Sequence, residues 1–375
     1  MKIAVNARFL IKGKMEGIGW YSHEVIRRMV AEHPEHEFHL IFDRPYDPDF
    51  IFGSNVIPHV LFPPARHPFL WWIWFEWSLP YLIRRIDPDV FFSPDGYLSL
   101  SLEIPQVMVM HDLAFLHFPG QIPFLVRKYY RHFVPRFLRK AAHVCAVSTA
   151  TLLDIAANYF LPENKMSVAY NGCKEEFRPL DESQIREVRL RYSGGSPYFL
   201  FVGAMHPRKN IPNLIRGFGV FKKQSGASVK LLLVGRQAWL TREIQVAFDE
   251  SAYQLDIVFL PYLQPGELAL LTGAALAAVA PSYLEGFGVP VLEALQCDVP
   301  VLVSDRFSLP EVGGPGALRF DPSDPDAIGR AMSEIMDERK RQECIDLGRA
   351  HRTHFSWDAS ARHIFAQLES VVKTT

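Results

Sequence analysis

The sequence predicts an α/β protein with two doubly wound domains, each built on a parallel sheet. Short apolar or β-branched runs alternate with amphipathic helical patterns almost throughout the chain, as in parallel sheets that carry helices on both faces. A chain of 375 residues is also longer than one ordinary core accommodates. The strand-like runs fall into two series, which predicts two sheets.

Six strands are expected in the first series and five in the second. Those of the first series are Ile3–Val5, Phe38–Phe42, Val90–Ser93, Gln106–Met110, His143–Val147 and Met166–Ala169. Those of the second series are Tyr198–Val202, Val229–Val234, Ile257–Leu260, Ala277–Ala280 and Val299–Ser304. Helical patterns lie between the strands, for example at Tyr21–Glu32, Arg127–Ala142, Ile211–Gln224 and Gly266–Gly273.

A linker is expected between the two series, where Pro179 and the run Ser193-Gly-Gly-Ser-Pro197 interrupt the pattern. We therefore expect domains at residues 1–180 and 181–355, followed by one more helical pattern at 356–375. Ligands of open α/β sheets bind outside the carboxyl ends of the strands. With two such domains, the ligand is expected in the cleft between them.

Composition excludes several classes of protein. An apolar fraction of 49% and a charged fraction of 22% are typical of a globular chain, and a net charge of −1 argues against nucleic acid as a partner. No secretory signal pattern opens the chain, and the most apolar window, Phe69–Ile83, is too short to span a bilayer. The cysteines show no metal or redox spacing: Cys145, Cys173, Cys297 and Cys344. A cytoplasmic protein is expected.

The most informative motif covers residues 282–295, where a glycine-rich loop leads into an apolar helical run. Glu285 on the loop and Glu293 on the helix are eight residues apart. Gly286 and Gly288 leave backbone N–H groups open at a helix N-terminus, where an anion binds favourably. Carboxylates that accept hydroxyl protons, beside amides that donate to phosphate, suit a sugar nucleotide. The alternative, a capping Glu285 and an exposed Glu293, leaves the two neighbouring glycines unexplained.

A pair of cations, Arg208 and Lys209, follows an expected strand in the run Gly203-Ala-Met-His-Pro-Arg-Lys-Asn210. Arginine offers a fork to phosphate oxygens, and lysine offers a compact charge. Charge alone favours two solvated loop cations. Their location at the carboxyl end of a strand, after a proline that stiffens the turn, favours a clamp on a leaving diphosphate.

The first half of the chain contributes two further candidates. The loop of residues 13–20 contains Gly17 and Gly19 and precedes a helix, so its backbone can approach a diphosphate. Its spacing is not G-x-G-x-x-G, and a surface turn explains it equally well. His111 follows the strand Gln106–Met110, where it can bond a substrate hydroxyl or phosphate or serve as a structural hydrogen-bonding group.

Three Asp-Pro-Asp runs bring carboxylates together at residues 47–49, 87–89 and 324–326. Their central prolines indicate turns, and no histidine or cysteine completes a metal site there. The sequence therefore predicts no metal site, and no cofactor beyond a nucleotide-sugar co-substrate.

With these residues in view, the chain resembles a retaining glycosyltransferase of the GT-B fold and of family GT4, or glycosyltransferase group 1. The segment Glu285–Glu293 is similar to that family's E-x7-E element, and Leu233-Val-Gly235 to another of its strand-end turns. The stretch from Phe355-Ser-Trp357 onward is similar to its closing helix, which in such proteins returns to the first domain. The run Pro207-Arg-Lys-Asn210 resembles bacterial mannosyltransferases of surface-polysaccharide assembly.

The resemblance implies a role for each motif residue. Glu285 would bind donor-sugar hydroxyls, and Glu293 would bind the hydroxyls of the nucleotide ribose. Arg208 and Lys209 would neutralise the diphosphate, and His111 would lie beside the anomeric carbon. Further donor contacts would come from Gly17, Gly19, Gly203, Gly235, Gly286, Phe287, Gly288 and Val289.

The resemblance also implies the reaction, which is transfer of a hexose with retention of configuration and without a metal. GDP-mannose is the expected donor, with a UDP-sugar as the alternative, and the acceptor would be a glycan or a polyprenyl-diphosphate-linked glycan. Ala204 departs from the family, many of whose members carry arginine there, and Arg208 would supply that cation. A catalytically silent nucleotide-sugar-binding scaffold and a GT-B sugar-nucleotide epimerase remain alternatives.

An aromatic and basic region in the first half suggests contact with a membrane. Residues 68–77 are rich in tryptophan, and residues 123–140 combine aromatic with basic side chains and contain no acid. A helix of that kind can lie on an anionic membrane surface at the inner face and reach a lipid-linked acceptor. For this basic helix, membrane contact and the absence of it fit the sequence equally well. For Trp72 and its neighbours we favour the alternative, that these rings belong to the core.

Overall fold

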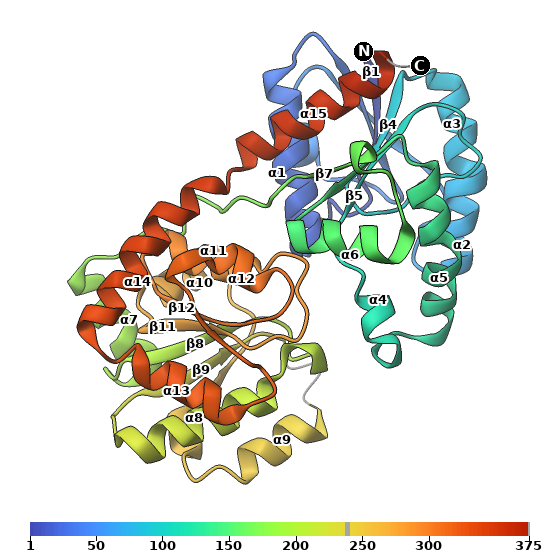
Figure 1. The fold of residues 1–375 in the computed structure, drawn as a ribbon. Helices are drawn as coiled ribbons and strands as arrows, with labels where there is room; N and C mark the ends of the chain where they lie inside the picture. Colours follow the sequence, from blue (N-terminus) through green and yellow to red (C-terminus); the bar gives the residue numbers. More distant parts are fainter. Residues whose placement is uncertain (237–240, 374–375) are drawn as a thin grey trace. The chain divides into compact units, whose positions relative to one another are not determined.

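The computed structural model describes residues 1–236 and 241–373, and they form two compact units (Figure 1). Unit 1 comprises Met1–Gly172 and Ser356–Thr375, and unit 2 comprises Cys173–Phe355. Residues 173–180, expected in the first domain, therefore belong to the second. The reason is packing within unit 2, because a Cβ on Gly273 would come within 2.8 Å of the Leu180 side chain.

Unit 1 is built on a seven-stranded parallel sheet with the order β3-β2-β1-β4-β5-β6-β7. Its strands are β1 (Lys2–Asn6), β2 (Glu37–Phe42), β3 (Val56–Val60), β4 (Val90–Ser93), β5 (Gln106–Met110), β6 (His143–Ala146) and β7 (Met166–Val168). In the register of the sheet, Ile3 of β1 pairs with Phe38 on one side and with Val90 on the other. Chain order reverses between β1 and β4, where open α/β sheets bind ligands.

Helices cover this sheet, and their inward faces form the core of unit 1. They are α1 (Gly17–Glu32), α2 (Pro68–Ile73), α3 (Leu79–Ile86), α4 (Ala114–His117), α5 (Phe124–Lys140), α6 (Thr149–Tyr159) and α15 (Trp357–Lys373). A π-helical segment, Trp74–Ser78, joins α2 to α3, and short 3-10 turns occur at Pro48–Phe50, Pro119–Gln121 and Glu163–Lys165. Trp74, Phe75, Phe91 and Phe137 are almost fully buried in this core.

The last helix, α15, belongs to unit 1, as the resemblance implied. It packs along α1, where Arg28 pairs with Asp358, and the Ser360 hydroxyl donates to the carbonyl oxygen of Tyr170. Residues 374 and 375 of the expected helix lie outside the described part of the chain. Figure 1 shows this helix, in red, beside the blue α1.

Unit 2 is built on a six-stranded parallel sheet with the order β10-β9-β8-β11-β12-β13. Its strands are β8 (Tyr198–Val202), β9 (Lys230–Val234), β10 (Ile257–Leu260), β11 (Ala277–Ala280), β12 (Val301–Ser304) and β13 (Leu318–Phe320). Its helices are α7 (Glu182–Ser193), α8 (Ile211–Ser225), α9 (Arg242–Asp249), α10 (Pro265–Gly273), α11 (Val289–Gln296), α12 (Leu309–Gly313), α13 (Pro325–Glu334) and α14 (Glu338–His351). Short 3-10 turns occur at Pro207–Lys209, Gln254–Asp256, Gly314–Gly316 and Arg352–His354.

Three local features differ from the sequence predictions. The edge strands β3 and β13 were not expected, because β3 carries Pro58 and β13 has only three residues, so neither shows a strand pattern. Helix α1 begins at Gly17 and not at Tyr21, so both loop glycines lie in its first turn. Glycine disfavours helix, and Gly17 and Gly19 therefore concealed that turn in the sequence.

The turn interpretation of the Asp-Pro-Asp runs is confirmed where the structure shows their bonds. The Asp47 carboxylate accepts from the backbone N–H of Asp49, and the Asp324 carboxylate accepts from that of Asp326. Asp87 has a left-handed backbone, with φ of 54°, at the end of α3. Across residues 1–236 and 241–373, no helix combines the length and the apolar character that crossing a membrane requires.

Candidate donor-binding site

The two motif segments of unit 2 meet at one point of its sheet. The strand order reverses between β8 and β11, and the loops that leave the carboxyl ends of these strands carry Arg208–Lys209 and Glu285. The backbone N–H of Tyr283 donates to the carbonyl oxygen of Arg208 at 2.8 Å, which joins the loops directly. A cavity of about 20 Å³, enough for a water at most, lies beneath them and is lined by Val202, Ala280, Glu285 and others.

Lys209 and Glu285 form the centre of the site. The Lys209 ammonium donates to Oε1 of Glu285, and both side chains are only 14% exposed. The Ser282 hydroxyl donates to the same oxygen at 2.6 Å. Burial alone would raise the pKa of Glu285, but the charges of Lys209 and Arg208 and the hydrogen bonds outweigh it, and the pKa lies below its ordinary value. Glu285 is therefore an ionised acceptor at neutral pH.

Buried polar side chains hold the two loops in place. Asn210, with a left-handed φ of 56°, donates through its amide to the carbonyl oxygens of Pro281 at 3.2 Å and of Pro322 at 2.6 Å. The Ser308 hydroxyl lies 2.8 Å from the carbonyl oxygen of Glu285 and 2.9 Å from that of Phe287. Sequence reasoning gave no role to Ser282, Asn210 or Ser308, although Ser282 and Asn210 stand within the motifs themselves.

Glycine is required at two of the expected donor contacts for geometric reasons. Gly288 has a φ of 100° at the N-terminus of α11, and a Cβ there would come within 2.8 Å of Leu309. A Cβ on Gly235 would come within 1.9 Å of the carbonyl oxygen of Gly203, so the turns after β8 and β9 touch only because Gly235 lacks a side chain. Gly288 and Val289 thus lie at the N-terminus of α11, where the donor contact is expected. At Gly203 and Gly235, close packing of the two turns is enough to explain the glycines.

Glu293 lies on α11, and its surroundings differ from those of the Lys209–Glu285 ion pair. Burial raises its pKa to about 7, and the charge of Lys174 only partly offsets that effect. Its side chain still keeps partial exposure to solvent. The two glutamates of the motif therefore differ: the pKa of Glu285 lies below its ordinary value, and that of Glu293 lies well above it.

In unit 1, His111 lies just after the carboxyl end of β5. Its Nε2–H donates to the carbonyl oxygen of Pro94 at 2.7 Å, so Nδ1 carries no proton when the ring is neutral. Burial lowers the pKa of His111, and the ring packs edge-on against Tyr21 with centroids 5.0 Å apart. The structural hydrogen bond considered for this histidine is therefore present, and it fixes the tautomer that a substrate would meet.

The glycines of the first loop occupy the N-terminal turn of α1. Gly17 is exposed, and a Cβ on it would meet no atom within 4 Å among the described residues. Gly19 is buried, and a Cβ on it would come within 2.9 Å of the carbonyl oxygen of Phe9. Gly17 is thus placed where an anion can approach a helix N-terminus, whereas Gly19 has a packing reason to be glycine.

Comparison with known proteins identifies the class. Residues 183–351 match the family described as "Glycosyl transferases group 1", and residues 15–177 match the family described as "Glycosyltransferase Family 4". The two matches together span most of the chain. The chain therefore carries glycosyltransferase domains of the group 1 and family 4 types, and it has the GT-B fold.

Individual relatives match this chain over most of their length. O-antigen chain mannosyltransferase B of Escherichia coli is 27% identical over 360 residues, which cover 93% of this chain and 94% of that protein. O-antigen chain mannosyltransferase RfbU of Salmonella typhimurium is 28% identical over 75% of this chain and 74% of its own.

Solved structures support the fold alone, because their identities are low. Sucrose-phosphate synthase from Thermosynechococcus elongatus superimposes with a TM-score of 0.82 at 18% identity and covers 100% of both chains. WaaG, a glycosyltransferase of lipopolysaccharide biosynthesis, superimposes with a TM-score of 0.73 at 13% identity, over 96% of this chain and 98% of its own.

Proposed function

We propose that this glycosyltransferase moves a hexose, best represented by mannose from GDP-mannose, to a glycan or lipid-linked glycan acceptor during cell-surface polysaccharide biosynthesis. The donor sugar would retain its configuration. The mannose preference is supported by the names of the O-antigen mannosyltransferases above. A UDP-sugar is the second candidate donor.

The observation that supports this function most directly is the arrangement around Glu285. An ionised carboxylate suits sugar hydroxyls as donors of hydrogen bonds, and Lys209, Arg208 and the amides that begin α11 supply positive potential for a diphosphate. Glycoside hydrolysis needs two carboxylates that flank the scissile bond. Here the carboxylate is tied to a cation, which favours binding of a charged donor over acid–base cleavage.

In the proposed reaction, the acceptor hydroxyl oxygen bonds to the anomeric carbon on the face from which the phosphate leaves. The bond from that carbon to the phosphate oxygen breaks, and the leaving phosphate takes the acceptor's proton. Lys209 and Arg208 stabilise the charge that develops on the phosphate. We assign to His111, Gly17 and Gly19 of unit 1 the donor contacts that the family resemblance implies, and to Glu293 the ribose hydroxyls.

Transfer and donor hydrolysis, followed with GDP-mannose and with UDP-hexoses, test this proposal. Wild-type protein should release GDP from GDP-mannose, and Glu285→Gln should abolish most of that release. Lys223→Met, which removes an exposed cation on α8, is the matched control and should keep full activity. EDTA should not lower turnover if Arg208 and Lys209 replace a metal. If none of the sugar conjugates releases its nucleoside diphosphate, the result would support the catalytically silent scaffold instead.

Contact with an anionic membrane is a second part of the proposal, and it rests on the surface of α2, the π-helical segment that follows it, and α5. Trp77 is 66% exposed and Trp72 is 38% exposed, so the core interpretation is wrong for these two rings, whereas Trp74 is fully buried. An open groove of about 660 Å³ runs between the two helices, lined in part by Phe69, Trp72, Leu125, Lys128, His132 and Phe133.

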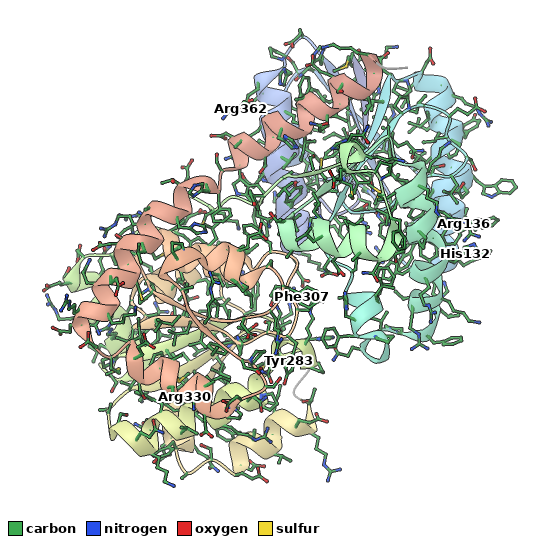
Figure 2. The ribbon with its side chains drawn as sticks, viewed as in Figure 1. His132, Arg136, Tyr283, Phe307, Arg330 and Arg362 are labelled. Carbon is green, nitrogen blue, oxygen red and sulfur yellow. The ribbon has the colours of Figure 1, made fainter. Side chains whose placement is uncertain are left out.

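Helix α5 also carries exposed cations, one of which, Lys128, lines the groove. They are Lys128, Arg131, Arg136, Arg139 and Lys140, and Figure 2 shows Arg136 together with His132 on this helix. Exposed aromatic rings amid cations are the features with which a helix binds an anionic lipid surface. Such contact would bring the enzyme to a lipid-linked acceptor.

Sedimentation with vesicles tests the membrane contact separately from transfer. The protein should sediment with vesicles that contain anionic lipid and should remain in the supernatant with purely zwitterionic vesicles. Replacing Lys128, Arg131 and Arg136 by glutamine should release it, without change in hydrolysis of a soluble donor. Equal sedimentation with both vesicle types, or none with either, would refute the contact.

A further inference from the structure

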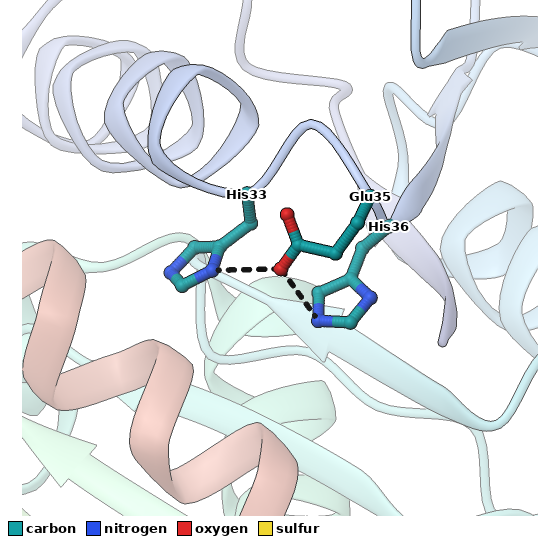
Figure 3. A group of neighbouring side chains, drawn as sticks. All are labelled: His33, Glu35 and His36. Atoms are coloured by element: carbon teal, nitrogen blue, oxygen red, sulfur yellow. Dashed lines mark ion pairs between the residues drawn. The ribbon is translucent and has the colours of Figure 1, made fainter.

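Three side chains of metal-ligand type converge in unit 1 where α1 ends and β2 begins, in the run His33-Pro34-Glu35-His36 (Figure 3). Nδ1 of His33 lies 3.5 Å from Oε1 of Glu35, and Nε2 of His36 lies 3.3 Å from the same oxygen. Across residues 1–236 and 241–373, this is the group of three His, Cys, Asp or Glu residues whose ligand atoms all lie within 4.8 Å of one another.

These distances are longer than those of good hydrogen bonds. A good N–H···O bond is about 2.7–3.2 Å long, and both contacts exceed that. The N-terminal amine also lies 2.9 Å from Nδ1 of His36, so Nε2 can bind a cation when that amine is neutral and accepts from Nδ1–H. In a tetrahedral zinc site with bonds of about 2.0–2.1 Å, neighbouring ligand atoms are about 3.3 Å apart. The two contacts that Glu35 makes are close to that spacing, and all three ligand atoms lie within 4.8 Å of one another.

The surrounding structure orients the ligands without help from a metal. The ring of Phe365 on α15 stacks on both imidazoles. Its centroid lies 3.4 Å from that of His33 with an interplanar angle of 7°, and 5.4 Å from that of His36 with an interplanar angle of 18°. The side-chain amide of Asn55 lies within 3.2 Å of the carbonyl oxygens of Val30, His33 and His36 and so fixes the turn. A prearranged ligand set loses less entropy when a metal binds.

We propose that His33, Glu35 and His36 bind a divalent transition cation of the Zn²⁺ class. Two imidazoles and one carboxylate are ligands that zinc and its neighbours accept, and the 60% exposed Glu35 leaves a path for the ion and for a water as fourth ligand. The site joins α1 and β2 beside α15. The site lies at the amino end of β2, whereas His111 follows the carboxyl end of β5, so the two are at opposite ends of the parallel strands. The cation would therefore stabilise unit 1 and take no part in transfer.

The sequence predicted no metal site, because only the Asp-Pro-Asp runs and the cysteines were considered as ligands. It is also independent of the proposed transferase function. Loss of the metal should leave turnover at low temperature unchanged, so the two proposals fail separately.

Calorimetric titration of the metal-free protein with Zn²⁺ tests the site. Wild-type protein should bind one equivalent at this site, and H33A and H36A should each weaken that binding by more than about tenfold. H132A, which removes an exposed histidine on α5, is the matched control and should bind like wild type. Zinc should also raise the melting temperature of wild type and H132A, and leave that of the H33A/H36A double variant unchanged.

A second measurement does not depend on how the variants fold. Titration of wild-type protein with Co²⁺ should give the visible absorption of a tetrahedral site with nitrogen ligands. Equal zinc affinity in wild type and the double variant would overturn the proposal. Binding only at millimolar zinc, or a cobalt spectrum of the hydrated ion, would overturn it as well.

Discussion

Replacing Lys209 by methionine tests whether its ammonium acts in turnover or only neutralises Glu285. Methionine keeps most of the length of the side chain and removes the charge. In the folded protein, the change leaves the largely buried carboxylate of Glu285 with the Ser282 hydroxyl and the more distant charge of Arg208 as partners.

The structure sets the size of both expected effects. Removing one partner of a buried ion pair costs roughly 3–5 kcal/mol of unfolding free energy, and the remaining partners of Glu285 place the loss near the lower end. Removing one donor to an oxyanion lowers kcat by about 10²–10³-fold. Turnover should therefore fall far more than the folded fraction of the protein.

Urea unfolding and steady-state donor turnover, measured at the same temperature, separate the two effects. The double variant Lys209→Met/Glu285→Gln should regain much of the lost stability, because no charge is left buried without a partner, and it should remain inactive. Near-normal turnover of Lys209→Met would refute the clamp. A double variant that is no more stable than the single one would refute the ion pair itself.

Three further predictions concern individual residues. Glu293→Gln should stabilise the protein more at pH 8 than at pH 4.5. The folded-state pKa of Glu293 is about 7, above the ordinary 4.5, so wild type loses unfolding free energy as pH rises through this window, by at most roughly 3 kcal/mol. A difference in urea midpoints that does not change with pH would contradict this. Gly288→Ala should reduce nucleotide affinity and stability together, because a Cβ meets Leu309 at 2.8 Å and φ is 100°, and unchanged calorimetric affinity would argue against a donor contact at this helix end. His111→Gln should lower kcat and leave the melting temperature within a few degrees, since the amide can still donate to the Pro94 carbonyl, and a variant that unfolds early would show that the histidine is structural.

Much of the fold could be predicted from the sequence because buried parallel strands form short continuous apolar runs. The strands of both sheets that lie between two neighbours were all expected, several to the residue. The missed elements are at the edges, where Pro58 interrupts β3 and where β13 has one neighbour and three residues. The start of α1 was missed because Gly17 and Gly19 do not look helical, and the domain boundary was misplaced because the packing of Leu180 on Gly273 leaves no local signal.

The residues of the candidate site were named from the sequence, but the contacts between them could not be predicted. Lys209 and Glu285 are separated by 76 residues, and no local pattern indicates that they form an ion pair. The sequence also gave both motif glutamates the same character. Burial and neighbouring charges make them different, because the cations of Lys209 and Arg208 keep Glu285 ionised while Glu293 meets mainly burial.

Equilibrium binding of GDP and GDP-mannose to wild type and to Glu285→Gln tests the central claim most directly. If Glu285 holds the sugar hydroxyls, the variant should bind GDP-mannose about ten- to a hundredfold more weakly, which corresponds to one lost charged hydrogen bond, and should bind GDP like wild type. Equal weakening of both ligands, or of neither, would contradict the claim that this carboxylate recognises the donor sugar.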